Sequence, residues 1–232
     1  MIPIKDNVPS RTYPIVNILL IWINFAVFAI ELAAGPRVHE IIATYGMTPA
    51  RFAQEGLTLA TAITFITSMF LHGGWAHIIG NMWFLYIFGD NVEDRMGHLR
   101  YLVFYLLGGI AGGLAHLAFN PLSPVPSIGA SGAIAAVLGA YYVLFPFARV
   151  AALVWFFWII DIIELPAITF LGFWFIFQFF SGLASLPLAG HFVGGVAWWA
   201  HVGGFAAGMI LVKFFCQRRE RCRFPYDFRP TW

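Results

Sequence analysis

Two stretches of 48 residues each contain no Asp, Glu, Lys or Arg, and they limit what this chain can fold into. The first runs from Tyr101 to Ala148 and the second from Leu165 to Val212. Charged residues make up only 10% of the chain, whereas a soluble globular domain carries about 25%. Each stretch is long enough for two membrane helices of about 20 residues and a connection. The composition therefore predicts a protein of the lipid bilayer and excludes a nucleic-acid-binding protein and a secreted disulfide scaffold.

Two shorter uncharged runs, Tyr13 to Ile30 and Phe65 to Gly89, provide one further span each. With two spans in each long stretch, the count is six transmembrane helices. We therefore expect an all-α membrane protein in which residues 1–232 form a single integral membrane domain. Its core covers about residues 13–215, and residues 216–232 form a basic tail.

The connections between the predicted spans differ in length. Roughly Gly35 to Thr64 forms a long first loop, which is moderately amphipathic and is expected to lie in the outer membrane interface. Val150 to Ile163 is apolar but too short for a span, and Pro166 follows it closely. An interfacial hairpin or helix on the cytoplasmic face is expected there instead of a seventh span.

The basic residues predict which side of the membrane the termini occupy. Six spans place both termini on one side, where eleven of the Lys and Arg residues then fall, against only Arg37 and Arg51 on the other. By the positive-inside rule both termini are cytoplasmic. The cysteines, Cys216 and Cys222, lie in the basic tail, where thiols are expected to be reduced. The sequence shows no targeting presequence, which favours a multi-pass protein of a prokaryotic cytoplasmic membrane.

Polar residues stand near the starts of three predicted spans. Gly129-Ala130-Ser131-Gly132 opens the fourth span, His72 and the segment His77 to Asn81 open the second, and His201 lies near the start of the sixth. Polar side chains inside a span are costly and raise a functional question. Each also has an ordinary explanation, because a serine can bond its own helix backbone and the other side chains can join neighbouring helices.

The predicted topology places these residues at one depth. Spans two, four and six all begin at the outer face, so Ser131, His77 and His201 are expected at similar shallow depths. A hydroxyl nucleophile needs an adjacent base, and imidazole can take its proton near neutral pH. Small residues at helical spacing, such as Gly204 and Gly208 after His201, allow two helix backbones to approach closely. We therefore expect Ser131 and His201 to form a nucleophile and base.

Acyl transfer also needs hydrogen-bond donors directed at the developing oxyanion. His77 and Asn81 are four residues apart and share one helix face. Together with the Ser131 backbone N–H, they form a candidate donor cluster. The outer-side carboxylates, Glu31, Glu40 and Glu55, all precede the second span, so the sequence predicts a Ser-His dyad. It indicates no metal site, no cofactor and no particular oligomeric state.

These residues resemble the rhomboid family of intramembrane serine proteases. The resemblance covers roughly Ile15 to Phe215, and its four segments follow the family's order. They are Gly129 to Gly132, His77 to Asn81 with His72 before them, the E-x-x-x-G element Glu93 to Gly97, and Ala200 to Gly204 with Gly208. The resemblance implies a compact rhomboid-like bundle of six helices with a cavity open to the outer face.

The resemblance also implies the roles of the site residues. Ser131 would be the nucleophile, His201 the base, and His77 and Asn81 the oxyanion stabilisers. The supporting residues would be Gly129, Gly132, His72 and Gly204. The substrates would be transmembrane segments of single-pass membrane proteins, and the helix near Phe170 to Phe180 looks like the family's lateral gate.

Two departures from the family pattern leave questions open. Many rhomboids have Trp-Arg where this chain has Ile63-Thr64, so the anchoring of the first loop is undetermined. Some members stack an aromatic residue against the catalytic histidine from the fourth position after the serine, where this chain has Ala135. The sequence does not say how His201 is held.

Two other functions are alternatives to proteolysis. A transporter or channel needs polar residues along a whole transmembrane path, whereas Val137 to Phe145 and Met209 to Val212 offer only Tyr141 and Tyr142. A non-proteolytic rhomboid-like protein that binds membrane clients usually lacks the serine or the histidine. This chain has both, which favours the protease.

Overall fold

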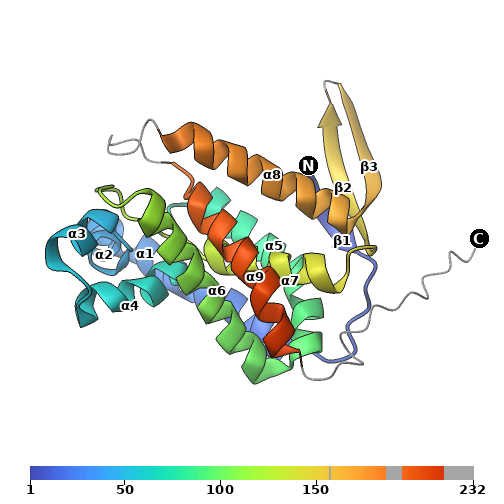
Figure 1. Ribbon diagram of the computed structural model, residues 1–232, viewed down its shortest axis with the longest axis horizontal. Helices are drawn as coiled ribbons and strands as arrows, with labels where there is room; N and C mark the ends of the chain where they lie inside the picture. Colours follow the sequence, from blue (N-terminus) through green and yellow to red (C-terminus); the bar gives the residue numbers. More distant parts are fainter. Residues whose placement is uncertain (157, 187–194, 217–232) are drawn as a thin grey trace, which may run out of the picture.

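The computed structural model describes residues 1–156, 158–186 and 195–216 of the chain. Within that part the protein is mostly helical, with one small sheet (Figure 1). The longer helices are α1 (Ile15–Ala34), α5 (Trp75–Met96), α6 (His98–Phe119), α7 (Ser131–Leu144), α8 (Ala167–Ser185) and α9 (Trp198–Phe215). Short helices α2 (Val38–Tyr45), α3 (Pro49–Glu55) and α4 (Leu59–Thr67) join α1 to α5, with single 3-10 turns at Gly35–Arg37 and Ser68–Phe70.

Helix α7 forms the centre of the bundle, and it is buried along most of its length. Helices α5, α6, α8 and α9 pack around it, with α6 and α9 side by side in Figure 1. Two glycines of α9 make its approach to α7 possible. A β-carbon on Gly204 would lie 2.1 Å from the Gly132 carbonyl oxygen, and one on Gly208 would lie 2.0 Å from the Ala136 carbonyl oxygen. The predicted close contact of these two helices through small residues is therefore confirmed.

The described residues contain fewer clear spans than the six predicted. Four helical segments are long and apolar enough to cross a membrane: Ile15–Tyr45, α6, α8 and α9. The segments Leu59–Phe70 and Trp75–Met96, bent by 82° at the break between them, add a fifth if they are taken as one span. Helix α7 has 14 residues, about 21 Å at 1.5 Å per residue, which is shorter than a hydrocarbon core of about 30 Å. The count of six remains a prediction.

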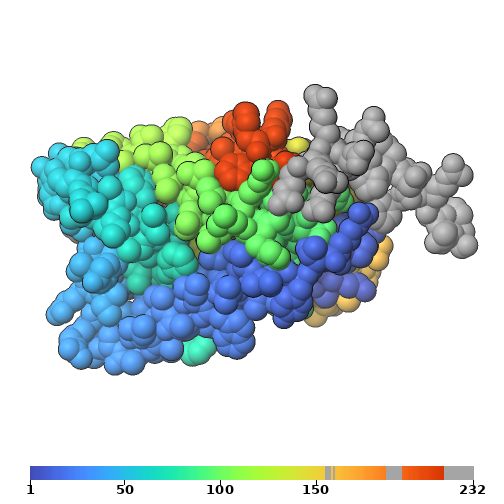
Figure 2. Space-filling model, turned by 90° about the horizontal axis from the view of Figure 1, so that it is seen from below, coloured from blue at the N-terminus to red at the C-terminus, as the bar shows by residue number. Residues whose placement is uncertain are grey.

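The segment between α1 and α5 is helical for most of its length. It begins at Gly35, where a φ of +54° ends α1. Helix α4 starts at Leu59, within the predicted loop, because the hydroxyl of Thr58 and that of Thr61 cap its first turn reciprocally. Figure 2 shows α1 along one face of the molecule, with α2 to α4 gathered at one end. The location of this segment in the membrane interface remains a prediction.

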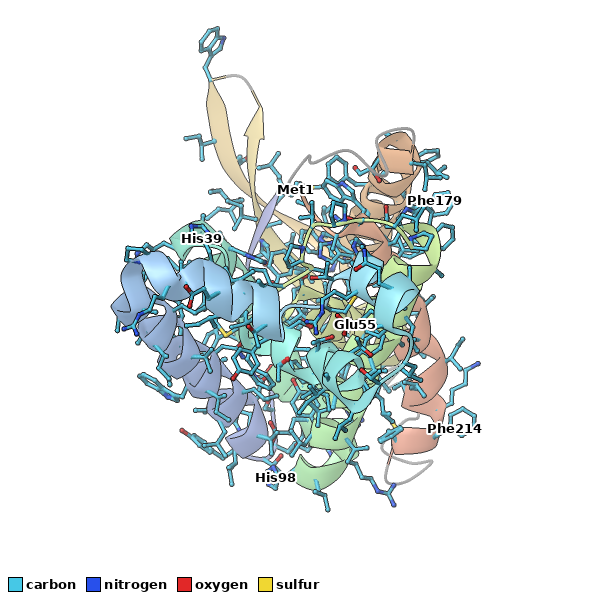
Figure 3. The ribbon with its side chains drawn as sticks, turned by 90° about the vertical axis from the view of Figure 1, so that its left-hand side faces the viewer. Met1, His39, Glu55, His98, Phe179 and Phe214 are labelled. Atoms are coloured by element: carbon cyan, nitrogen blue, oxygen red, sulfur yellow. The ribbon has the colours of Figure 1, made fainter. Side chains whose placement is uncertain are left out.

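The structure is mostly helical, as expected of an all-α membrane protein, and it adds a small antiparallel sheet of three strands. Strands β2 (Arg149–Phe156) and β3 (Ile159–Pro166) form a hairpin, and β1 (Ile2–Asp6) pairs with β2. The sequence predicted either a hairpin or a helix here, and the structure has the hairpin. Figure 3 shows this hairpin projecting from the helices. Its β-branched and aromatic residues suit a strand. The pairing with β1 joins segments about 150 residues apart, which hydropathy does not detect.

Two carboxylates at this end of the bundle, Glu93 buried and Asp6 partly buried, hold neighbouring segments together. Glu93 accepts hydrogen bonds from the backbone N–H groups of Val16 (3.0 Å) and Asn17 (2.7 Å), and so caps the start of α1. Asp6 of β1 accepts a 2.5 Å hydrogen bond from the hydroxyl of Tyr141 on α7. The N-terminal strand is thereby tied to the central helix.

The redox state of Cys216, the residue after α9, differs from the one that the sequence predicted. Cys216 is disulfide-bonded in the structure, so the expectation of a reduced thiol at this position is wrong. That expectation rested on the redox state of the compartment and not on chain geometry. Cys222 and the rest of the predicted basic tail after Cys216 lie outside the described residues.

Candidate active site

Four of the predicted site residues line one cavity. Ser131, His201, His77 and Asn81 all border a cavity of about 810 Å³. They come from α7, α9 and α5, and Trp174 of α8 also lines it. The segment before α7 closes another part of the wall with Val125 to Ile128. Residues that are separated by up to about 120 positions in the chain are thus brought to one space.

Ser131 is the first residue of α7, so its backbone N–H has no partner within the helix. The preceding turn depends on Gly129, whose φ is +118°. A β-carbon there would lie 2.6 Å from His77 Nε2 and 3.5 Å from Asn81 Nδ2. Only glycine satisfies both the backbone conformation and this space. Gly129 therefore supports the site by letting His77 and Asn81 approach the turn that precedes Ser131.

The hydrogen bonds of His77 indicate which of its ring nitrogens carries the proton. The backbone N–H of Gly73 donates to Nδ1 of His77 (3.3 Å). Because Nδ1 accepts, the proton of the neutral ring lies on Nε2, the nitrogen next to Gly129. Nδ2 of Asn81 is also buried, and it has no hydrogen-bond partner among the described residues. Two N–H donors, one from each side chain, thus lie beside the turn.

His72 lies behind His77 and does not line the large cavity. The two imidazole rings meet edge to face, with their centroids 5.1 Å apart. The backbone N–H of His72 donates to both carboxylate oxygens of Glu31 (3.2 and 3.1 Å). Glu31 is buried on α1. This carboxylate, which the sequence analysis did not assign to the site, holds the loop from which His77 receives its hydrogen bond.

His201 is buried on α9 and is held from α8. Its Nδ1 lies 2.7 Å from Oε1 of Gln178, and the ring of Trp174 lies 5.9 Å from its own, centroid to centroid. Trp174 and Gln178 are one helical turn apart on α8, which lies beside α9 in Figure 1. These contacts answer the question that Ala135 left open. Gln178 was not among the predicted site residues, although an amide within an apolar span is itself an indication of function.

The first loop is anchored without a Trp-Arg pair. Ile63 is 52% exposed, and the hydroxyl of Thr64 donates within its own helix, to the Thr61 carbonyl. The loop instead pairs with the segment before Ser131. Met47 and Ser127 exchange two backbone hydrogen bonds of 3.1 and 2.8 Å. These bonds connect the first loop directly to the turn that precedes α7.

A second cavity of about 20 Å³ lies next to Ser131. Ser68 and Ser127 line it, together with Gly129 and Ala200. Its volume is sufficient for about one water molecule. In the described part of the chain, no group of three or more His, Cys, Asp and Glu side chains is arranged to hold a metal ion.

Comparison with known proteins gives one family. The family model of the rhomboid domain matches residues 59–218. The chain is 33% identical over 138 residues to rhomboid protease GluP of Bacillus subtilis, covering 59% of this chain and 25% of that protein. It is 31% identical over 154 residues to rhomboid-like protein 11, chloroplastic, of Arabidopsis thaliana, covering 64% of this chain and 50% of that protein. It is 32% identical over 131 residues to rhomboid-related protein 2 of Mus musculus, covering 56% of this chain and 42% of that protein. The matches thus span a quarter to a half of these relatives.

Proposed function

This chain belongs to the rhomboid family, since the domain matches more than half of it, and on that premise we propose that it is an intramembrane serine endopeptidase. Its substrates are transmembrane segments of single-pass membrane proteins. The observation that carries the proposal is the cavity lined jointly by Ser131, His201, His77 and Asn81. A nucleophile, a base and two donors from separate segments are the groups that acyl transfer requires.

The first half of the proposed reaction forms an acyl-enzyme. Oγ of Ser131 attacks the scissile carbonyl carbon while Nε2 of His201 takes the hydroxyl proton. The carbonyl oxygen becomes an oxyanion, which accepts hydrogen bonds from Nε2–H of His77, Nδ2–H of Asn81 and the Ser131 amide. The unpartnered, buried Nδ2 of Asn81 supports this assignment, because an unsatisfied buried donor costs about 1–3 kcal/mol until an acceptor arrives. The C–N bond then breaks, and the proton on His201 passes to the leaving amine.

The second half hydrolyses the acyl-enzyme. His201 takes a proton from a water molecule, the hydroxide attacks the ester carbon, and Ser131 leaves with the proton from His201. Water must reach Ser131 within a largely apolar bundle. The small cavity beside Ser131 has room for that molecule.

We also propose the membrane arrangement that goes with this chemistry. Helix α7 is the fourth span in chain order and completes the six, and its short length suits a helix that α5, α6 and α9 surround. Both termini are cytoplasmic and the protein lies in a prokaryotic cytoplasmic membrane. Ser131, at the start of α7, then lies below the outer surface.

The direct test is cleavage of a model single-span substrate by the purified protein in liposomes. Wild type is compared with Ser131→Ala and His201→Ala, and mass spectrometry identifies the cut. Ser181→Ala on α8 is the matched control, because Ser181 does not line the cavity. We expect cleavage by wild type and the control only. Cleavage by Ser131→Ala would refute the assignment, and no cleavage by wild type would favour a client-binding protein.

A further inference from the structure

The amide of Gln178 occupies the place where many serine hydrolases have a third catalytic-site residue. Its Oε1 lies 2.7 Å from Nδ1 of His201, and both side chains are buried, at 5% and 9% exposed. An amide oxygen can only accept a hydrogen bond, so Nδ1 of His201 is the donor. The second ring nitrogen, Nε2, therefore keeps its lone pair. This is the tautomer that a base needs in order to take a proton from Ser131.

We propose that Gln178 is a positioning residue that fixes the tautomer and the ring orientation of His201 in this protein. The inference rests on the proposed function, and it extends the predicted Ser-His dyad by a neutral partner. This partner is an amide, whereas the sequence offered only the carboxylates Glu31, Glu40 and Glu55 on the outer side. An amide suits this position because an unpaired carboxylate within the bundle would carry a large desolvation cost.

The position of Gln178 also links the base to one particular helix. Gln178 and Trp174 both belong to α8, and both contact the ring of His201 from there. The remaining contacts of His201 include the edge of Trp198 on its own helix (6.3 Å between centroids). A displacement of α8 therefore removes the hydrogen bond and a packed ring together. In this arrangement the orientation of the base depends on where α8 lies.

The test compares two substitutions that differ in one property. Gln178→Met keeps an unbranched side chain of similar length but removes the acceptor, while Gln178→Glu keeps an oxygen acceptor at the same place. We expect kcat to fall about 10- to 100-fold in Gln178→Met with KM changed less than about three-fold, because the third residue orients the base and does not hold substrate. Gln178→Glu is expected to stay within about three-fold of the wild-type kcat, since a neutral carboxyl still presents a carbonyl oxygen that accepts from Nδ1–H.

A second measurement separates the role of Gln178 from substrate entry along α8. The rate at which a small fluorophosphonate labels Ser131 depends on the base and not on a transmembrane substrate. We expect this rate to fall in Gln178→Met in parallel with kcat, and to remain unchanged in Ser181→Ala on the same helix. Thermal unfolding in detergent shows whether each variant is folded. If Gln178→Met is not folded, Gln178→Leu is used in its place.

The outcomes distinguish this inference from the proposed function. In one outcome, the wild type cleaves in a Ser131-dependent way while a folded Gln178→Met has the same kcat and the same labelling rate. That result would overturn the positioning role of Gln178 and leave the proposed protease function standing. A change in KM alone would overturn it as well, because the residue would then act on substrate binding. Absence of Ser131-dependent cleavage and labelling in wild type would end both proposals.

Discussion

Gly204 on α9 and Gly132 on α7 touch backbone to backbone. A β-carbon on Gly204 would lie 2.1 Å from the carbonyl oxygen of Gly132 and 3.2 Å from the β-carbon of Ala135. These residues are the immediate neighbours of the two proposed catalytic side chains, since Gly132 follows Ser131 and Gly204 lies one turn after His201. The close approach of the helices that carry the proposed nucleophile and base therefore depends on the absence of a side chain at position 204.

Gly204→Ala should push α9 away from α7. We expect a loss of about 1–3 kcal/mol in the free energy of unfolding, which is typical of overpacking in a core, and at least a ten-fold loss of cleavage because His201 is displaced from Ser131. Thermal unfolding in detergent and the liposome cleavage assay measure the two effects. Gly172→Ala is the matched control, since a β-carbon at 172 would make only an ordinary contact at 3.9 Å. Equal behaviour of the two variants would contradict this role of Gly204.

Asn81→Ala should impair the chemical step with little effect on substrate binding. Nδ2 of Asn81 has no hydrogen-bond partner among the described residues, and removal of one oxyanion donor typically lowers kcat by about 10²–10³-fold. We expect a decrease of this order with KM nearly unchanged, measured by steady-state cleavage. Asn7→Ala, at the far end of the bundle, should keep the wild-type kcat. If Asn81→Ala turned over at the wild-type rate, Asn81 would not be an oxyanion donor.

Glu31→Gln should weaken the support of the loop that holds His77. The carboxylate of Glu31 accepts from the His72 backbone N–H through both oxygens, and hydrogen bonds to charged groups contribute about 1.5–3 kcal/mol. We expect a lower unfolding temperature and a several-fold slower cleavage. Glu40→Gln is the control, because Glu40 is an exposed residue in the first turn of α2. Identical unfolding temperatures for the two variants would count against this support.

Asp6 should make the stability of the protein depend on pH. Burial raises the pKa of Asp6 to about 6 from its ordinary value of 3.8, and the neighbouring Asp90 carboxylate adds to the shift, against the opposing hydrogen bond from Tyr141. A carboxyl whose pKa is higher in the folded state favours the folded state when protonated, so its contribution to stability decreases as the pH rises from about 4 to about 6.

The measurement is the unfolding temperature of wild type and Asp6→Asn between pH 4 and pH 8. Relative to Asp6→Asn, wild type should lose stability between pH 4 and pH 6 and then stay level. Asn keeps an oxygen that can accept from Tyr141 but does not ionise, so the variant lacks this titration. Parallel curves for the two proteins across the range would exclude a raised pKa for Asp6.

The local pattern of residues was sufficient for part of this description. The long uncharged stretches predicted a multi-pass helical membrane protein, and the family match agrees with the motifs around Ser131, His77 and His201. Ser131, His77 and His201, which the predicted topology placed at one depth, line one cavity. Hydropathy is calculated from the residues of one segment, and a motif is defined by the order of residues along the chain. Both can therefore be read without knowing how the segments are arranged in space.

The rest was decided by contacts between distant segments. Gln178 meets His201 across two helices, and Asp6 meets Tyr141 across 135 positions. The strand β1, the bend of 82° before α5 and the burial of the 14-residue α7 also depend on what lies beside them. The amino-acid sequence alone was enough to predict that this protein lies in a lipid bilayer and to select the residues that are proposed to carry out its chemistry. The partners that orient those residues became known only from the tertiary structure, because hydrogen bonding and close packing depend on the relative positions of helices.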